Sequence, residues 1–282
     1  MYIFKKVTDL KNHLDELRDS NATIAFAPTM GALHNGHMSL VSKCNKIADI
    51  TVSSIFVNPT QFNDKSDLEK YPRTVETDTI MLIEHGCDVL FFPEVDEIYP
   101  HGTEPSTNYD FGQLDKVLEG AHRPGHFVGV AQVVNRLLEL VEPNWIVMGQ
   151  KDYQQTAIIR KLLSLTDSKT KIVVSPTIRE TDGLAMSSRN VRLKPDERKE
   201  APTIYASLEA VKQSYKTISV AEAKEQAIKS IEASGSMKID YLDIIDPNTL
   251  ISVKDWSDSE NLVVCTAVHL GSVRLIDNIL IP

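Results

Sequence analysis

The sequence predicts an α/β protein with a Rossmann-like, doubly wound parallel sheet and a smaller C-terminal α+β domain. Two observations predict this fold. Up to Pro176, short runs of β-branched and aromatic residues alternate with segments of helical periodicity, which is typical of a parallel sheet. After Pro176, two helical segments are followed by strands of alternating hydrophobicity, which favours an antiparallel α+β arrangement. We therefore expect a first domain over residues 1–176 and a second over 177–282 that closes over the site.

The first buried strand and the helix after it define the N-terminal domain. Residues 23–27 (TIAFA) form an apolar run of strand length, and the apolar residues that follow residue 37 recur at helical spacing, so we expect a helix beginning near Gly36. The remaining elements expected in this domain are a helix over 8–17 capped near Thr8, a strand over 49–57, a polar loop over 63–73, a helix over 75–85 ended by Gly86, a strand over 88–93, an irregular stretch over 94–125, helices over 127–141 and 153–165, and strands over 145–148 and 171–175.

The C-terminal domain is expected to contain two helices and three strands. Its helices are predicted over residues 195–215 and 220–234, and its strands over 237–245, 261–269 and 273–281.

Composition limits the function classes. A net charge of −9 over 282 residues argues against a protein that binds nucleic acid along a broad basic surface. No apolar run approaches the roughly 18 residues of a membrane span, and the first residues lack the apolar core of a signal peptide, so we expect a cytoplasmic protein. Cys44, Cys87 and Cys265 have no metal-binding spacing and are expected to be reduced and buried.

The segment after the first strand, residues 28–37 (PTMGALHNGH), has the features of a phosphate site. A helix N-terminus that follows the carboxyl end of a strand presents unpaired N–H groups, to which phosphate binds readily. His34 and His37 add donors at the same place, and Gly36 allows the backbone to approach a nucleotide closely. The alternative is that one or both histidines are ordinary surface or helix-capping residues.

Polar side chains follow two further strands of the predicted sheet. Asn58 and Gln61 follow the second strand, and residues 149–152 (GQKD) follow the fourth. Ligands of parallel sheets bind at the carboxyl ends of the strands, so we expect these groups to converge with the histidines. Lys151 and Asp152 could instead form an exposed ion pair of little consequence.

A second cluster lies at the expected domain junction, in residues 181–190 (TDGLAMSSRN). Asp182 and Gly183 predict a turn, and Ser187, Ser188 and Arg189 combine hydroxyl groups with a guanidinium suited to phosphate oxygens. A polar loop leading into a helix would have the same composition. No Walker A or GxGxxG motif is present, so Mg²⁺ is expected mainly as the counter-ion of a nucleotide.

Read together, six segments resemble the pantothenate synthetase family, the pantoate–β-alanine ligases of coenzyme A biosynthesis within the HxGH nucleotidyltransferase superfamily. The segments are residues 28–37, 56–62 (FVNPTQF), 71–74 (YPRT), 118–127 (LEGAHRPGHF), 149–155 (GQKDYQQ) and 182–190 (DGLAMSSRN). They cover most of the first domain and the junction, whereas the sequence after about residue 195 adds little.

The resemblance implies a two-step reaction in which pantoate attacks ATP to give pantoyl adenylate and pyrophosphate, and β-alanine then displaces AMP. It assigns His34, His37, Lys151 and Arg189 as catalytic residues. The positions that match the ATP site are Met30, Gly31, Ala32, Leu33, His34, Asn35, Gly36, His37, Gly149, Gln150, Lys151, Asp152, Ile178, Met186, Ser187, Ser188 and Arg189. The positions that match the pantoate and β-alanine pocket or its gate are Asn58, Gln61, Tyr71, Glu119, Arg123, His126 and Gln155.

Three further expectations stay open at this point. The family implies a homodimer and ATP with Mg²⁺, but no protein ligand of the metal is predicted. Glu76 and Asp78 could hold Mg²⁺, although the alternative of solvated charges on an exposed helix is favoured. Finally, a nucleotidyltransferase that keeps the adenylyl group on its product, or a non-catalytic nucleotide-binding protein, could share the same fold.

Overall fold

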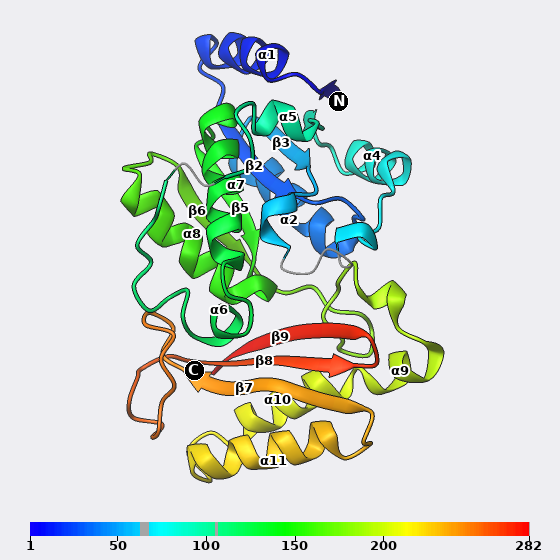
Figure 1. Cartoon of the computed structure of the whole chain (residues 1–282), viewed down its shortest axis with the longest axis vertical. Coiled ribbons are helices and arrows are strands. Elements are labelled where there is room, and N and C mark those ends of the chain that lie inside the picture. The colour runs from blue at the N-terminus through cyan, green and yellow to red at the C-terminus, as the bar shows by residue number, and fades with distance from the viewer. Residues whose placement is uncertain (63–67, 105–106, 282) are drawn as a thin grey trace. The chain divides into compact units, whose positions relative to one another are not determined.

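A six-stranded parallel sheet and a three-stranded antiparallel sheet organise the chain in the computed structural model, which describes residues 1–62, 68–104 and 107–281 (Figure 1). The chain divides into two units, which we describe separately. The first unit comprises Met1–Phe111, Arg123–Gly149 and Ile158–Pro176. The second comprises Gly112–His122, Gln150–Ala157 and Thr177–Pro282.

The sheet of the first unit has the order β1-β4-β3-β2-β5-β6, and every neighbouring pair is parallel. Its strands are β1 (Tyr2–Phe4), β2 (Ile24–Thr29), β3 (Ile50–Ile55), β4 (Val89–Phe91), β5 (Trp145–Gly149) and β6 (Lys171–Ser175). The doubly wound sheet and all five predicted strands are confirmed. β1 was not predicted, because three residues at a sheet edge are too few to establish a hydrophobic pattern.

The strand order places a topological switch between β2 and β5. The chain builds the sheet outward from β2 through β3 to β4, and then returns to add β5 and β6 on the other side of β2. In such sheets, ligands bind beside the carboxyl ends of the strands at the switch. The three predicted groups follow β2, β3 and β5, which are neighbours in the sheet.

The segments between these strands largely match the prediction. They are α1 (Val7–Asp19), α2 (Asn35–Ile47), the 3-10 turn η1 (Pro59–Gln61), α4 (Val75–Glu84), α5 (Val95–Ile98), α6 (Leu118–His122), α7 (His126–Val141), the 3-10 turn η2 (Gln150–Asp152) and α8 (Tyr153–Leu165). Gly86 has a φ of +74°, as its place after α4 requires. The cap predicted near Thr8 is wrong: Lys6 is the N-cap and provides no side-chain bond. The polar loop expected over 63–73 lies partly outside the described residues, since 63–67 are not described.

The second unit contains the antiparallel sheet β7-β8-β9 and the predicted strands are confirmed. Its elements are η3 (Asn190–Arg192), α9 (Pro195–Glu200), α10 (Thr203–Gln213), α11 (Val220–Glu232), β7 (Met237–Ile245), β8 (Leu262–Leu270) and β9 (Val273–Ile281). The single helix predicted over 195–215 is wrong, because it is divided into α9 and α10. Pro202 lies at the division, where its ring and missing N–H prevent continuation of α9.

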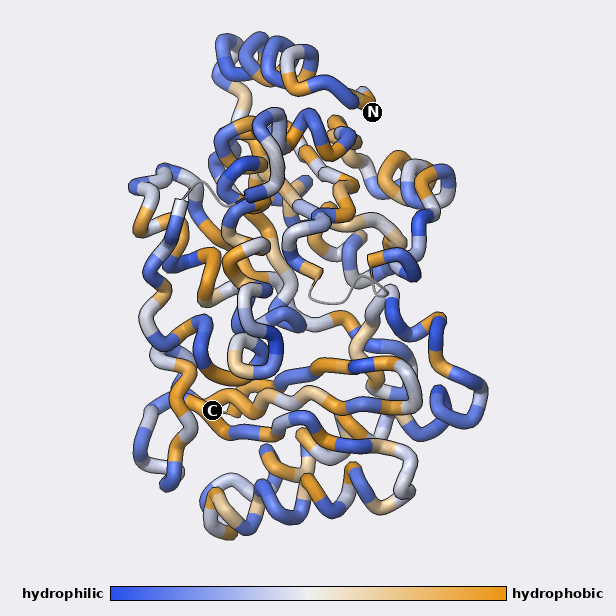
Figure 2. Tube along the Cα trace, viewed as in Figure 1, coloured by the Kyte–Doolittle hydropathy of each residue, from blue (hydrophilic) through white to orange (hydrophobic). Residues whose placement is uncertain are grey.

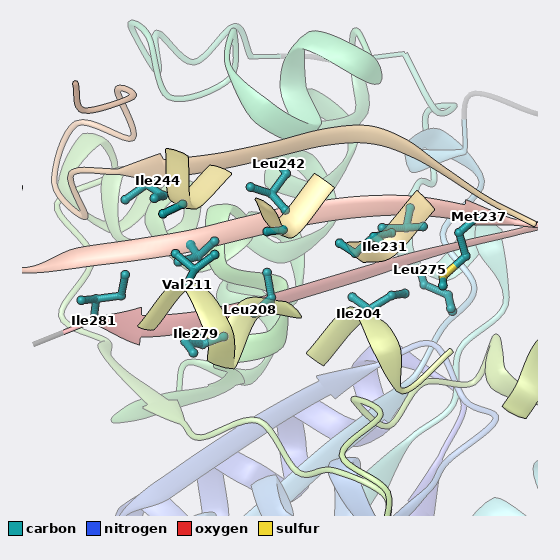
Figure 3. Close-up of a cluster of buried hydrophobic side chains, with 14 of the residues drawn as sticks. Ile204, Leu208, Val211, Ile231, Met237, Leu242, Ile244, Leu275, Ile279 and Ile281 are labelled. Carbon is teal, nitrogen blue, oxygen red and sulfur yellow. The ribbon is translucent and has the colours of Figure 1, made fainter. Parts of the chain in front are cut away.

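One hydrophobic core holds this sheet to its helices. Hydrophobic residues recur along α10 and α11 between hydrophilic ones, as Figure 2 shows. Figure 3 shows that Leu208 of α10 and Ile231 of α11 pack among side chains of β7 and β9, such as Leu242 and Leu275. These residues are at most 6% exposed, so the sheet forms a rigid base for the segments beside it.

Two expectations from composition can be compared with the described residues. Cys44, Cys87 and Cys265 are unpaired and buried, as predicted. Within the described parts of the chain, we find no helix with both the length and the apolar character that crossing a bilayer requires.

Candidate active site

The turn between β2 and α2 brings His34 and His37 together at a helix N-terminus. His34 is the N-cap of α2, and its Nδ1 accepts a hydrogen bond from the backbone N–H of Gly36 at 3.1 Å. The Nδ1 of His37 accepts in turn from the backbone N–H of His34 at 3.3 Å. The two rings lie 4.1 Å apart between centroids. Both histidines therefore cap the helix, as the alternative interpretation from the sequence proposed.

These bonds determine the hydrogen positions on both rings. A neutral imidazole has one acceptor and one donor nitrogen, so a ring whose Nδ1 accepts carries its hydrogen on Nε2. His34 and His37 thus each have an Nε2–H donor, next to the N-terminus of the 13-residue helix α2. Such an arrangement suits anionic oxygens, because the helix dipole and both donors favour negative charge there.

Asp78 of α4 holds the turn that precedes these histidines. Its Oδ2 accepts from the backbone N–H of Ala32 at 2.9 Å, and its Oδ1 accepts from that of Leu33 at 2.8 Å. The hydroxyl of Thr74 donates to the same Oδ1 at 3.0 Å. Asp78 is 1% exposed, so its interpretation as a solvated charge on an exposed helix is wrong. Both oxygens instead serve as acceptors for a partly buried turn, in which Ala32 has a φ of +50°.

Asn58 and Gln61, which follow β3, lie in one hydrogen-bond network. The buried Asn58 side chain donates through Nδ2 to Gln61 Oε1 at 3.2 Å and to the carbonyl of Gly129 at 3.1 Å, and it accepts from the Tyr99 hydroxyl at 2.8 Å. Gln61 Nε2 then donates to the sulfur of Met30 at 3.0 Å. Gln61 is therefore oriented by its neighbours and lies beside the residue that opens the histidine turn.

His126 and Arg123 support the same region from the start of α7. The Gln61 carbonyl, 2.8 Å from His126 Nδ1, can only accept, so His126 carries its hydrogen on Nδ1 and its Nε2 accepts from Arg123 at 3.1 Å. His126 is buried, as is Tyr71, whose ring meets that of Phe62 edge to face. The structure thus brings Gln61, His126 and Arg123 together; the expected gate is not tested by these contacts.

In the second unit, the turn η2 carries Lys151 and Asp152, which follow Gly149 at the end of β5. Lys151 Nζ lies 3.8 Å from Asp152 Oδ1, and the Lys151 side chain is 19% exposed. The backbone of this turn is bound by Asn278 of β9, whose Nδ2 donates to the carbonyl oxygens of Gln150 and Lys151. Asn278 could not be predicted as a site residue, because the sequence of β9 contains no recognised motif.

The cluster that contains Ser187 and Arg189 follows a short hairpin. Residues 179 and 185 form an antiparallel bridge, Gly183 has a φ of +94°, and Asp182 Oδ1 accepts from the N–H of Leu184. The turn predicted at Asp182 and Gly183 is confirmed, and the hydrogen bond from Arg198 lowers the pKa of Asp182. Beyond the hairpin, Ser187 Oγ accepts from the N–H of Arg189 at 3.2 Å. Ile178 begins this hairpin and Met186 ends it, joined by an N–H to carbonyl bond of 3.0 Å.

Glu119, which the resemblance places at the pocket, forms a buried ion pair within the second unit. Arg274 of β9 donates to both of its carboxylate oxygens, at 2.7 and 2.8 Å, and also to Asp240 at 2.9 Å. Burial opposes the charge of Arg274, yet its two carboxylate partners outweigh this effect and raise its pKa above the ordinary value. Gln155 lies in the first turn of α8, beside the buried Gln154, whose amide binds the carbonyls of Leu114 and Val117.

Comparisons with known proteins show which family and which solved structures this chain is similar to. The family described as pantoate-beta-alanine ligase matches residues 2–280. A pantothenate synthetase of Porphyromonas gingivalis is 47% identical over 281 residues, and one of Azobacteroides pseudotrichonymphae is 46% identical over 280, each alignment covering 99% of both chains. The crystal structure of pantothenate synthetase from Thermus thermophilus matches with a TM-score of 0.92 at 40% identity over 99% of both chains. The pantoate-beta-alanine ligase of Francisella tularensis, crystallised with beta-gamma ATP and beta-alanine, matches with a TM-score of 0.83 at 35% identity, over 99% of this chain and 97% of the other.

Proposed function

The chain belongs to the pantoate–β-alanine ligase family, and we propose that it forms pantothenate through a pantoyl adenylate, with AMP and pyrophosphate as the other products. A carboxylate and an amine do not condense directly in water, because the carboxylate oxygen is a poor leaving group. Transfer of the adenylyl group converts that oxygen into part of a good leaving group. The ATP-type ligand of the Francisella tularensis ligase supports ATP as the source of this group.

The first step makes one bond and breaks one bond at the α-phosphorus of ATP. A carboxylate oxygen of pantoate attacks this phosphorus, and pyrophosphate leaves with the electrons of the broken P–O bond. Negative charge grows on the phosphate oxygens, where the Nε2–H groups of His34 and His37 donate and Lys151 and Arg189 supply positive charge. Preorganised donors of this kind each contribute roughly a hundredfold to a thousandfold to rate.

In the second step, the amine of β-alanine attacks the carbonyl carbon of the adenylate and forms the C–N bond. The bond from this carbon to the phosphate oxygen breaks, AMP leaves with its electrons, and the nitrogen releases one proton to solvent. Gln61 and Gln155 bind pantoate through neutral amides, which suit its hydroxyl and carboxylate groups. Asn58 acts by orienting Gln61, while Tyr71, Arg123 and His126 hold the surrounding pocket. Placing both reactants side by side contributes several kcal/mol through orientation alone.

The remaining assignments rest on the resemblance to the family. ATP is bound by the residues at positions 30–37, 149–152, 178 and 186–189. Mg²⁺ enters as the counter-ion of ATP, because the phosphates of a nucleotide supply several of its ligands. The Asp78 carboxylate accepts from two backbone N–H groups. The enzyme acts in the cytoplasm as a homodimer.

The observation that carries the proposal is the pair of histidines at the N-terminus of α2, His34 and His37, whose ring centroids lie 4.1 Å apart. The test supplies ATP–Mg²⁺, pantoate and β-alanine, omits each in turn, and measures AMP, pyrophosphate and pantothenate. With all three substrates present, we expect AMP, pyrophosphate and pantothenate in equal amounts. When any substrate is omitted, we expect no pantothenate. A lasting adenylylated product with no requirement for the amine would support a nucleotidyltransferase instead, and binding of ATP without turnover would support a non-catalytic protein.

A further inference from the structure

Asn278 of β9 fixes the main chain of the turn that carries Lys151. Its Nδ2 donates to the carbonyl oxygen of Gln150 at 3.0 Å and to that of Lys151 at 2.9 Å. Gln150 Nε2 returns a hydrogen bond to Asn278 Oδ1 at 3.2 Å. Asn278 is only 2% exposed, so water does not compete for these bonds. One buried amide thus determines where the backbone of η2 lies.

The neighbouring residue, Asp277, fixes the hairpin that leads to Ser187 and Arg189. Its carboxylate accepts two hydrogen bonds from Arg179, at 2.6 and 2.9 Å, and is 5% exposed. Arg179 also donates to the carbonyl of Gly183 at 3.1 Å, and its guanidinium lies 3.8 Å from the centre of the Tyr205 ring. A planar guanidinium that is hydrogen-bonded at both terminal nitrogens and stacked on an aromatic ring has little conformational freedom. The base of the hairpin is therefore held in one place.

The position of these two residues on β9 explains how one strand can serve two segments. Adjacent side chains of a strand point to opposite faces of the sheet. β9 is an edge strand of the β7-β8-β9 sheet, and its pairing with β8 places Asp277 opposite Thr266 and Asn278 opposite Cys265. Asp277 can therefore serve the hairpin while Asn278 serves η2. The well-packed core behind the sheet keeps both in register.

We propose that Asp277 and Asn278 are positioning residues for the adenylation step, Asn278 for Lys151 and Asp277, through Arg179, for Ser187 and Arg189. Neither residue is assigned a contact with substrate. The inference rests on the proposed function of Lys151 and Arg189 in binding the phosphates of ATP. A charged donor stabilises a transition state only if it is already in place, and a displacement of about 1 Å can lower a rate a hundredfold.

A double-mutant cycle tests whether Asn278 acts through Lys151. We expect Asn278→Ala to lower the single-turnover rate of pantoate-dependent pyrophosphate formation by about tenfold to a hundredfold, with the KM for β-alanine unchanged. In a Lys151→Ala background, the same change should lower the rate by less than about twofold further, because the group it positions is gone. Independent effects that multiply in the double variant would overturn the inference.

A matched control separates positioning from loss of stability. Thr266 of β8 is fully buried, and its hydroxyl donates to the carbonyl of Tyr241 at 2.8 Å. Thr266→Val removes a buried hydrogen bond from the same sheet, yet it should leave the adenylation rate within about twofold of the wild-type rate even if Tm falls. An equal loss of rate in this variant would also overturn the inference.

Arg179→Lys provides a second route if Asn278→Ala does not fold. Lysine keeps the positive charge beside Asp277 but cannot form the bidentate hydrogen bond that arginine forms. We therefore expect the variant to fold and its KM for ATP to rise by about fivefold or more. An unchanged KM and rate would count against the role of Asp277. The wild-type enzyme separates the two hypotheses. If it forms no pyrophosphate from pantoate and ATP, the proposed function fails, whereas failure of the inference alone leaves wild-type activity and the Lys151→Ala defect intact.

Discussion

The Asp78 carboxylate accepts a hydrogen bond from the backbone N–H of Leu33 at 2.8 Å, across 45 residues of chain. Leu33 lies in the turn that ends one residue before the N-cap of α2. A second backbone N–H in this turn binds the other carboxylate oxygen. Because buried N–H groups without acceptors are costly, a single side chain of α4 determines whether the histidine turn keeps its shape.

Replacing Asp78 should therefore disturb the histidine turn. Asp78→Asn puts an NH₂ group where one of the two N–H donors now finds an oxygen, so we expect the free energy of unfolding to fall by about 1–3 kcal/mol and the adenylation rate to fall by about tenfold or more. Denaturant unfolding and single-turnover pyrophosphate formation from ATP and pantoate measure the two effects. Glu76→Gln makes the same change of charge at an exposed position of α4 and should alter neither. Similar behaviour of the two variants would show that charge, and not the anchored turn, matters.

His37 has a capping role and a proposed chemical role, and two substitutions separate them. His37→Ala removes both, whereas glutamine at the third helical position can keep the capping bond to the His34 N–H. We expect a rate of adenylation lower by roughly a hundredfold or more in both variants. Only His37→Ala should lose stability, by about 1 kcal/mol. A single-turnover rate that His37→Gln restores to the wild-type value would contradict the donor role and leave a structural one.

Gly129 permits α7 to contact the turn that carries Gln61. A Cβ built on Gly129 would lie 2.4 Å from the carbonyl oxygen of Thr60, so Gly129→Ala must displace this backbone. We expect a KM for pantoate higher by about tenfold and a lower Tm, although alanine is normally the better helix former by about 1 kcal/mol. Steady-state kinetics with pantoate and ATP varied separately check this, with Asn135→Ala, at a partly exposed position of α7, as control. A more stable enzyme with an unchanged KM would refute the close approach.

The buried cysteines should make stability depend on alkaline pH. Burial raises the pKa of the Cys44 thiol and that of the Cys87 thiol to about 12, against about 8.5 in an unfolded chain. The folded state therefore binds these protons more tightly, and its advantage is complete below pH ~8.5 and is lost as the pH rises toward 12. We expect the free energy of unfolding to fall by about 1 kcal/mol per thiol between pH 7.5 and 9.5.

Comparison with the Cys44→Ala/Cys87→Ala variant isolates this contribution, because that variant should show a smaller fall over the same pH range. Both thiols should also resist an aromatic disulfide reagent at pH 8 until the protein is unfolded. Rapid modification of either thiol in the native enzyme would contradict the burial on which the prediction depends.

Features encoded by neighbouring residues could be predicted from the sequence. The strand at 171–175, the helix at 153–165 and the glycine turn after α4 match because hydrophobic period and turn chemistry act over a few residues. The division at Pro202 also has a local cause, which the continuous hydrophobic pattern of residues 195–215 concealed.

Features that depend on partners far along the chain could not be predicted. Asp78 resembles a metal ligand or a solvated charge until α4 is placed against the turn after β2. Asn278 and Arg274 lie in a sequence without a recognised motif, and their roles follow only from their contacts with Lys151 and Glu119. Tertiary hydrogen bonds of this kind leave no periodic pattern in a single sequence.

The transfer of an oxygen atom from pantoate to AMP tests the central claim most directly. Pantoate labelled with ¹⁸O in both carboxylate oxygens is converted with ATP and β-alanine, and the products are analysed by mass spectrometry. If pantoyl adenylate is the intermediate, one ¹⁸O remains in the amide carbonyl of pantothenate and one appears in the phosphate of AMP at each turnover. AMP without ¹⁸O, or labelled inorganic phosphate formed together with ADP, would contradict the account.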